Sequence, residues 1–227
     1  MKGLYENVLL GAFIFRLGYK MGETGKLKNT PFSPNLFQQT PLDPIFSDFV
    51  GVSGGRAFML ELKKNWEGRS SELTKKKCKL LKENSELAEL AGKCHLLGYG
   101  KEINYAPQPG DISNPSGSAP LRVLDIFFCN YLQGVSAKAE EELKTPWLMN
   151  DFLQDIADDK VGASLKEFCN YIRKYLELLV AKSKAPGLVL TAKANIGDLA
   201  SAEGSIAVLN TGNALYACRS PLLSIWA

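Results

Sequence analysis

A short segment with two neighbouring glycines constrains the fold of this chain more than any other feature. It spans residues 47–64 and has the sequence "SDFVGVSGGRAFMLELKK". Gly54-Gly55 is typical of a two-residue hairpin loop, because a type I′ turn needs positive φ at both central positions. The segment therefore predicts two antiparallel strands, in a register that places Asp48 directly opposite Glu61.

The expected hairpin has two faces, because successive side chains of a strand point to opposite sides of the sheet. One face carries Asp48, Val50, Val52, Ala57, Met59, Glu61 and Lys63, and the other carries Phe49, Gly51, Arg56, Phe58, Leu60, Leu62 and Lys64. Both faces are largely apolar, so we expect other elements to cover the sheet on both sides.

Two carboxylates in directly opposed positions, as expected for Asp48 and Glu61, repel each other unless a cation lies between them. For a site made only of oxygen ligands, Mg²⁺ or Mn²⁺ is the natural cation.

Lys63 adds a positive charge to the face that carries Glu61. An ammonium group there can stabilise an attacking hydroxide or the charge that develops on a phosphate. Together with a metal ion that activates water, Asp48, Glu61 and Lys63 would supply the parts for phosphodiester hydrolysis. The same spacing allows a second interpretation, in which both acids lie at solvent-exposed strand ends and Lys63 is a surface partner of one of them.

The first half of the chain indicates alternating helices and strands. Residues 3–21 are apolar almost all round, which is typical of a helix covered by other elements on most sides. Residues 22–44 are rich in Gly, Pro, Thr and Asn and are expected to form a loop, as are residues 106–120. Strands are expected at 94–103 and at 121–132, and the apolar sequence of the second suits a central strand.

The second half is expected to be helical over residues 137–182 and to end in short strands, with "NTGN" at 210–213 as a hairpin turn. The order of elements indicates a mixed α/β or α+β domain. We divide the chain into a core at 1–135 and a second part at 136–227, which we expect to pack on the core as one unit.

Composition narrows the class of protein only slightly. The chain has 227 residues and a net charge of +3, which permits a polyanionic partner without requiring one. Its five cysteines form no CxxC pair and His95 is the only histidine, so we expect buried thiols in a reducing, cytoplasmic setting and no structural zinc site. The uncharged apolar run at 8–15 is too short to span a membrane, and no membrane association is expected.

At Asp48 and "Glu61-Leu62-Lys63" the sequence resembles the PD-(D/E)xK nuclease superfamily, whose members have a restriction-endonuclease-like fold. This resemblance implies a central mixed sheet flanked by helices, with an acid on one hairpin strand and E-x-K on the next. It implies that Asp48 and Glu61 bind Mg²⁺ or Mn²⁺, that Glu6 of the first helix is a further ligand, and that Lys63 is catalytic. Family members often have proline before the first acid, where this chain has Ser47; Asp43, in "Asp43-Pro44", is therefore an alternative ligand.

The function expected from this resemblance is metal-dependent nucleic-acid hydrolysis, of DNA rather than RNA. Five lysines that follow the motif in "KKKCKLLK" could track a phosphate backbone, or could form an ordinary solvated helix face: Lys75, Lys76, Lys77, Lys79 and Lys82. The second half of the chain would supply specificity, self-association or a protein-partner site. The alternative function is a non-catalytic interaction protein on the same scaffold, which binds or regulates a nucleic-acid-processing assembly.

Overall fold

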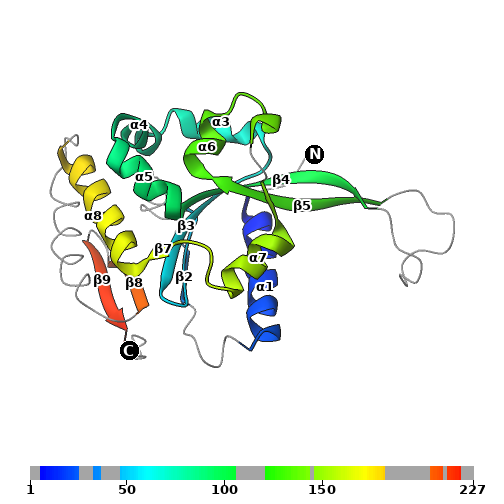
Figure 1. Cartoon of the computed structure of the whole chain (residues 1–227), viewed down its shortest axis with the longest axis horizontal. Helices are drawn as coiled ribbons and strands as arrows, with labels where there is room; N and C mark the ends of the chain where they lie inside the picture. Colours follow the sequence, from blue (N-terminus) through cyan, green and yellow to red (C-terminus); the bar gives the residue numbers. More distant parts are fainter. Residues whose placement is uncertain are drawn as a thin grey trace.

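A mixed β-sheet with helices on both faces forms the framework of the protein (Figure 1). The computed structural model describes residues 6–25, 33–36, 47–105, 121–143, 146–181, 205–211 and 214–220. One face of the sheet is covered by α1 (Glu6–Glu23) and α7 (Met149–Ala157). The other face is covered by α4 (Lys76–Glu83), α5 (Ser85–Cys94), α6 (Tyr131–Ser136) and α8 (Leu165–Ala181). The turn α3 (Ser70–Leu73) and two 3₁₀ turns, η1 (Glu67–Arg69) and η2 (Glu140–Glu142), lie in the connections.

The strands of this sheet follow the order of the chain, from β1 to β6. They are β1 (Ser33–Leu36), β2 (Phe49–Ser53), β3 (Arg56–Lys63), β4 (His95–Tyr105), β5 (Leu121–Asn130) and β6 (Trp147–Leu148), and β7 (Ala163–Ser164) also pairs with β3. The pairs β1–β2, β2–β3, β4–β5 and β5–β6 are antiparallel, whereas β3 and β4 are parallel. The parallel pair is possible because the helices α3 to α5 carry the chain back across one face of the sheet.

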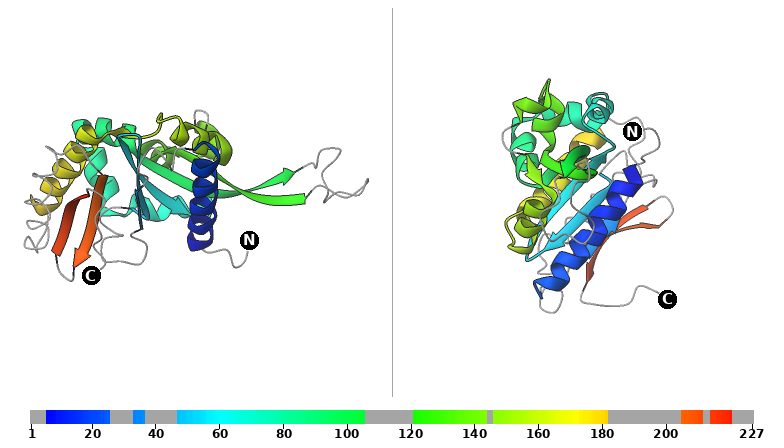
Figure 2. Two further views of the ribbon diagram at one scale, coloured as in Figure 1. Left: turned by 90° about the horizontal axis from the view of Figure 1, so that it is seen from below. Right: turned by 90° about the vertical axis from the view of Figure 1, so that its right-hand side faces the viewer.

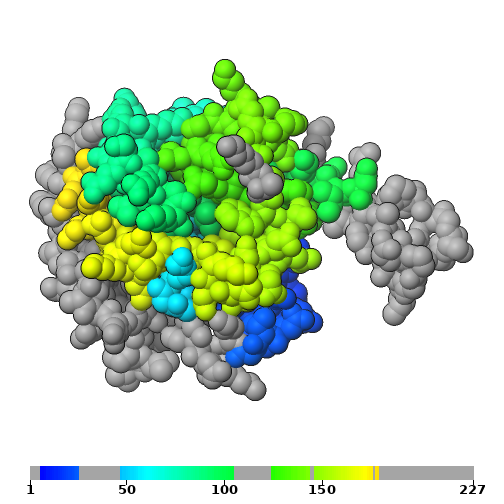
Figure 3. Space-filling view, in the orientation of Figure 1, coloured from blue at the N-terminus to red at the C-terminus, as the bar shows by residue number. Residues whose placement is uncertain are grey.

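The β2–β3 hairpin has the predicted register. Ser53 pairs with Arg56 and Phe49 pairs with Leu60, so the next position places Asp48 across from Glu61. Gly54 and Gly55 both have positive φ, 56° and 77°, as the predicted turn requires. In Figure 3 the tip of this hairpin (cyan) lies at the surface between the segments of α7 and α8.

The hairpin contributes alternate side chains to two separate hydrophobic cores, as the sequence predicts. Val50, Val52, Ala57 and Met59 pack with the helices α4, α5, α6 and α8. Phe49, Phe58, Leu60 and Leu62 pack with α1 and α7. A single strand pair is therefore buried on both faces, which explains why its sequence is almost continuously apolar.

Helix α1 differs from the expectation that it is covered on most sides. Leu9, Phe13 and Leu17 are buried against the sheet and α7, but Phe15 and Tyr19 are 75% and 68% exposed. Figure 2 shows α1 lying along one side of the sheet, where no other drawn helix or strand covers its outer face. The prediction was wrong because an apolar face does not by itself reveal whether another element of the same chain covers it.

An edge strand lies inside the segment that was expected to be a loop. β1 (Ser33–Leu36) pairs with β2, from Ser33 opposite Val52 to Leu36 opposite Phe49. The segment includes Pro34, which lacks a backbone donor and is tolerated in a strand at the edge of a sheet. Composition alone therefore gave the wrong assignment for these four residues.

β4 and β5 were both predicted, but β5 is not a central strand along its whole length. β4 pairs with β3 only as far as Tyr99, and β5 pairs with β6 only at Phe127 and Phe128. From Gly100 opposite Ile126 outward, the two strands pair only with each other and extend away from the body of the protein (Figure 1). The loop expected at 106–120 lies outside the described residues.

The second half of the chain contributes side chains to the hydrophobic cores on both faces of the main sheet. β6 and β7 join the main sheet, α7 packs beside α1, and α8 packs over β3 and α5. A boundary at residue 135 therefore does not divide the hydrophobic cores. The C-terminal strands β8 (Ser205–Thr211) and β9 (Ala214–Ser220) form the predicted antiparallel hairpin, with Thr211 opposite Ala214.

The cysteines whose surroundings the structure describes agree with the expectation of buried thiols. Cys78, Cys94, Cys129 and Cys169 are all buried and form no disulfide. Among the described residues, none of the helices combines the length and hydropathy needed to cross a bilayer.

Candidate functional site

Two glutamates and three lysines meet in the interior at the carboxyl end of β3. We call Glu61, Lys63, Glu72, Lys75 and Lys77 the charged cluster. β3 supplies Glu61 and Lys63, α3 supplies Glu72, and Lys75 and Lys77 come from the start of α4. Four of these side chains are almost completely buried, and Lys75 is 27% exposed.

Glu61 is the centre of the charged cluster, because its carboxylate accepts from all three ammonium groups. Its Oε1 lies 2.9 Å from Lys63 Nζ and 2.8 Å from Lys75 Nζ. Its Oε2 accepts from Lys77. The side chain of Glu61 is fully buried, and a buried charge needs this kind of pairing to be tolerated.

Glu72 is a second buried carboxylate in contact with the same lysines. Its Oε1 lies 2.6 Å from Lys75 Nζ and 3.0 Å from Lys63 Nζ, and its Oε2 lies 3.6 Å from Lys77 Nζ. The hydroxyl of Tyr131, in α6, donates a hydrogen bond to Oε2 at 3.0 Å. Lys63 and Lys75 therefore each bridge the two glutamates.

These contacts shift the pKa of Glu61, Lys63 and Lys75. Burial alone would raise the pKa of Glu61, but Lys77, Lys63 and Lys75 outweigh it and hold that pKa well below its ordinary value. Burial alone would lower the pKa of Lys63 and Lys75, but the neighbouring carboxylates outweigh it and raise both. The groups with shifted pKa therefore all stay charged at neutral pH.

Asp48 and Glu6 lie at the border of the charged cluster. The backbone N–H of Leu62 donates to Asp48 Oδ2 at 2.6 Å, which places this carboxylate against β3 between Glu61 and Lys63. Glu6 Oε1, in the first turn of α1, lies 3.9 Å from Lys63 Nζ. Asp48, Glu61 and Lys63 are 3%, 0% and 5% exposed, so the interpretation of solvent-exposed strand ends is wrong. Asp43, the alternative ligand, lies outside the described residues.

The five lysines of the expected phosphate-binding patch do not share one surface. Lys77 is buried and Lys75 is directed at the two glutamates, so neither belongs to a solvated helix face. Lys76, Lys79 and Lys82 are exposed on α4. The expectation of a single surface patch is therefore corrected, and only three of its members lie on the exposed side of α4.

His95 lies behind the charged cluster at the start of β4. Its Nδ1 is 2.8 Å from the hydroxyl of Tyr171, and its ring stacks on Tyr131 at a centroid distance of 4.2 Å. Burial, reinforced by the charge of Lys77, lowers its pKa to about 3. His95 is therefore a neutral histidine of the core.

Whether the charged cluster can hold a metal ion depends on the lysine ammonium groups that lie between its carboxylates. Among the described residues, no group of three or more His, Cys, Asp or Glu side chains is arranged to hold a metal ion as it stands. The cation positions beside Glu61 and Glu72 are instead filled by lysine ammonium groups, of which Lys75 is the most exposed. Binding of a metal ion by these carboxylates would therefore require an ammonium group to move away from them.

The sequence did not point to Glu72 or Tyr131 as members of a site. Glu72 does carry one local signal, since Lys75 follows it at the i,i+3 spacing at which side chains on a helix meet. No local sequence pattern links Tyr131 to Glu72, because the two residues are 59 positions apart in the chain.

Comparison with known proteins gives no family assignment: no family model, no curated protein and no solved structure matches this chain.

Proposed function

We propose that the protein is a metal-dependent nuclease of the PD-(D/E)xK type, acting on DNA in preference to RNA. The observation that carries this proposal is the burial of Asp48, Glu61 and Lys63 together at one end of a hairpin with the expected register. Burying charged groups costs free energy, and well-packed apolar residues of similar size are often at least as stable. A buried cluster of strongly shifted ionisable groups is therefore a candidate for function.

The order of the elements supports the same proposal. A helix is followed by the strands that carry the motif, then by helices, and then by a further strand. This is the order of the restriction-endonuclease-like fold, and here that further strand, β4, is parallel to β3. The proposed core spans residues 1–135, with the elements from α1 to β5, and the remaining elements complete the two hydrophobic layers.

Each residue of the proposed site has a distinct role. Asp48 and Glu61 would hold Mg²⁺ or Mn²⁺, with Glu6 as a further ligand. When bound, the ion would neutralise phosphate charge and lower the pKa of a bound water molecule. Lys63, protonated at neutral pH because of Glu61 and Glu72, would stabilise the charge that develops on the phosphate. Lys76, Lys79 and Lys82 would contact the nucleic-acid backbone.

Cleavage assays test this proposal directly. Supercoiled plasmid, single- and double-stranded oligonucleotides and RNA would be incubated with the protein and Mg²⁺ or Mn²⁺, with EDTA as the metal-free control. Because Lys63 supplies transition-state stabilisation, Lys63→Met should lower the cleavage rate about 10²- to 10³-fold. Lys64→Met changes the neighbouring lysine and should cleave as the wild type does.

A second measurement separates metal binding from catalysis. Mn²⁺ should raise the melting temperature of the wild type and should do so less in Asp48→Asn, since a ligand that binds only the folded state stabilises it. Absence of both cleavage and stabilisation by Mn²⁺ would refute the nuclease proposal.

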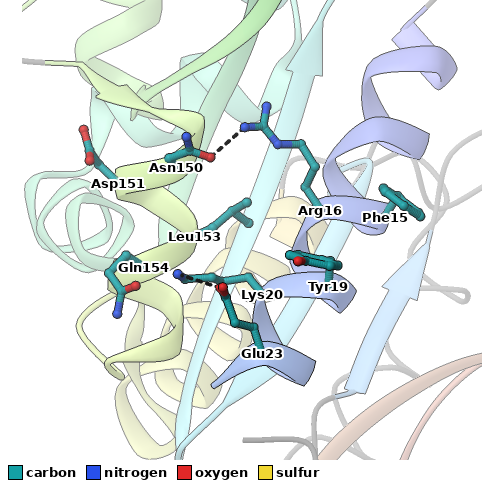
Figure 4. A pocket seen from close by; sticks show the side chains of 9 residues that line it. All are labelled: Phe15, Arg16, Tyr19, Lys20, Glu23, Asn150, Asp151, Leu153 and Gln154. Carbon is teal, nitrogen blue, oxygen red and sulfur yellow. Dashed lines mark hydrogen bonds and ion pairs between the residues drawn. The ribbon is translucent and has the colours of Figure 1, made fainter. Parts of the chain in front are cut away.

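The outer face of α1 favours the alternative, an interaction protein on the same scaffold. In Figure 4, Arg16 and Lys20 point from α1 toward α7, and Phe15 and Tyr19 lie beside them on α1. Val8, Phe15 and Tyr19 are between 50% and 75% exposed along this outer face. Exposed apolar side chains that cluster on one face are typical of protein contact sites, so a chain that neither cleaves nor binds Mn²⁺ would point to this function.

A further inference from the structure

Seven exposed residues form one stripe along the outer side of α1. Residues that are three, four or seven positions apart lie on the same face of a helix, and here that face is opposite to the buried Phe13 and Leu17. We call these residues the outer stripe: Val8, Gly11, Ala12, Phe15, Gly18, Tyr19 and Gly22. All seven are uncharged, which is typical of a contact surface and not of a solvated helix face.

Two glycines in the middle of the outer stripe have no evident role within this chain. A Cβ atom at Gly11 or Gly18 would meet no atom within 4 Å, and neither residue has a positive φ. A glycine inside a helix costs roughly 0.5–1 kcal/mol relative to alanine. The space beside each glycine is open only from outside the molecule, where a bulky side chain of another helix can enter it.

Large and small residues of the outer stripe are arranged symmetrically about Phe15. Three pairs lie seven, four and three positions from Phe15 on either side: Val8 with Gly22, Tyr19 with Gly11, and Ala12 with Gly18. If two copies of α1 pack antiparallel with Phe15 at a two-fold axis, the members of each pair face each other across the interface. The larger side chain of each pair then meets glycine. A two-fold interface needs a surface that is complementary to itself in this way, so the pattern identifies a second copy of this chain as the occupant.

We propose that the protein forms a two-fold symmetric dimer in which the outer stripes of two copies pack antiparallel, with the two Phe15 side chains in contact at the axis. Antiparallel packing also places the amino end of each helix beside the carboxyl end of the other, which their dipoles favour. This inference does not depend on the nuclease proposal.

The area of the outer stripe sets the expected strength of the dimer. Phe15 and Tyr19 are 75% and 68% exposed. Since an aromatic side chain can bury about 200 Å², these two rings offer about 300 Å² per copy. The remaining residues of the stripe add to this area along about 21 Å of helix. A standard interface buries about 800 Å² per partner, so we expect a dimer at the weak end of the range, with a Kd of micromolar order.

Sedimentation velocity of the full chain at about 1 to 200 µM tests whether the dimer forms. The wild type should dimerise with increasing concentration. Phe15→Asp should remain monomeric, because it places two carboxylates together at the axis. Leu148→Asp changes an apolar residue that is 44% exposed outside α1 and should dimerise as the wild type does. A wild type that stays monomeric, or a Phe15→Asp variant that still dimerises, would refute the proposal.

Exchanging the residues of one pair tests the antiparallel register. Gly11→Tyr places two tyrosines opposite each other, and Tyr19→Gly places two glycines opposite each other, so each should raise the Kd about tenfold. The double variant Gly11→Tyr/Tyr19→Gly again places each tyrosine opposite a glycine and should recover the affinity of the wild type. Both positions are exposed, so we expect each variant to fold. A double variant that dimerises no better than the single variants would overturn the proposed register.

Cross-linking gives a second measurement of the same geometry. With Phe15 at the axis, Phe15→Cys should form a disulfide-linked dimer under mild oxidation, whereas Tyr19→Cys should not, because the two copies of position 19 lie about 12 Å apart along the helices. The wild type controls for the native cysteines. Cross-linking through position 19 but not position 15 would contradict the proposal. None of these measurements involves cleavage or metal binding, so the dimer and the nuclease proposal can fail separately.

Discussion

The two faces of strand β3 show how differently neighbouring residues of one strand can be stabilised. Leu60 and Leu62 point into an apolar core with α1 and α7, in which Phe13, Phe128 and Phe152 make ring contacts. Glu61 and Lys63 point to the opposite side, into the charged cluster. The first face needs only side chains of suitable volume, whereas the second needs every charge to keep its partner.

The two faces should differ most in how much stability they lose when a side chain is replaced by another of similar size. Lys77→Met keeps most of the side-chain volume but leaves the buried Glu61 and Glu72 with one ammonium group fewer. We expect it to lower the free energy of unfolding by about 3–5 kcal/mol, because the buried Glu61 Oε2 loses the ammonium group from which it accepts a hydrogen bond. Urea unfolding at pH 7 measures this loss, with Lys79→Met as an exposed control that should change stability by less than about 0.5 kcal/mol. A loss for Lys77→Met no larger than that of the control would mean that the stability of the cluster does not depend on the pairing of Lys77 with Glu61.

Acidification from neutral pH should destabilise the folded protein through His95. Its pKa is lowered to about 3 in the folded protein, whereas an unfolded histidine has a pKa of about 6.5. The unfolded state therefore binds more protons between these values, and stability falls as the pH falls through this range. Lowering the pH from 7 to 5 should cost about 2 kcal/mol.

The control for this pH dependence is His95→Gln, since His95 is the only histidine of the chain. Urea unfolding of this variant at pH 7 and pH 5 should show a much smaller difference in free energy of unfolding between the two pH values than the wild type shows. A slope that survives the substitution would assign the pH dependence to other groups.

On the apolar side of the sheet, a substitution should lower the free energy of unfolding by much less than Lys77→Met does. Phe152 stacks on Phe128 at a centroid distance of 4.1 Å and is fully buried. Phe152→Leu retains an apolar side chain and should lower the free energy of unfolding by about 1 kcal/mol. If urea unfolding showed the same loss in free energy of unfolding for Phe152→Leu as for Lys77→Met, the contrast between the two faces would be refuted.

The sequence was sufficient for the features that depend on local chemistry. Gly54-Gly55 gave the turn and hence the register of β2 and β3, and the alternation of side chains gave the two faces correctly. The same reasoning placed Asp48 against Glu61 and Lys63, and the structure shows all three buried.

The features that sequence reasoning missed depend on contacts between distant segments. Glu72 and Tyr131 lie 59 positions apart and meet only in the folded chain. Lys77 belongs to a lysine-rich segment that resembles a solvated face, and only the position of Glu61 beneath α4 turns it inward. The open face of α1 was missed for the converse reason, since nothing in an apolar helix reveals which of its sides lacks a neighbour.

One edge of β3 is shared by two strands that are far apart in the sequence. β7 pairs with β3 at Arg56 and Ala57, and β4 takes over the same edge from Met59 onward. During synthesis on the ribosome, the beginning of β3 therefore keeps a bare edge until Ala163–Ser164 has been translated. A nascent chain that stalls before this point offers unpaired backbone donors and acceptors to any other strand. The edge of β3 at Arg56 and Ala57 is therefore completed only by two residues that are translated much later.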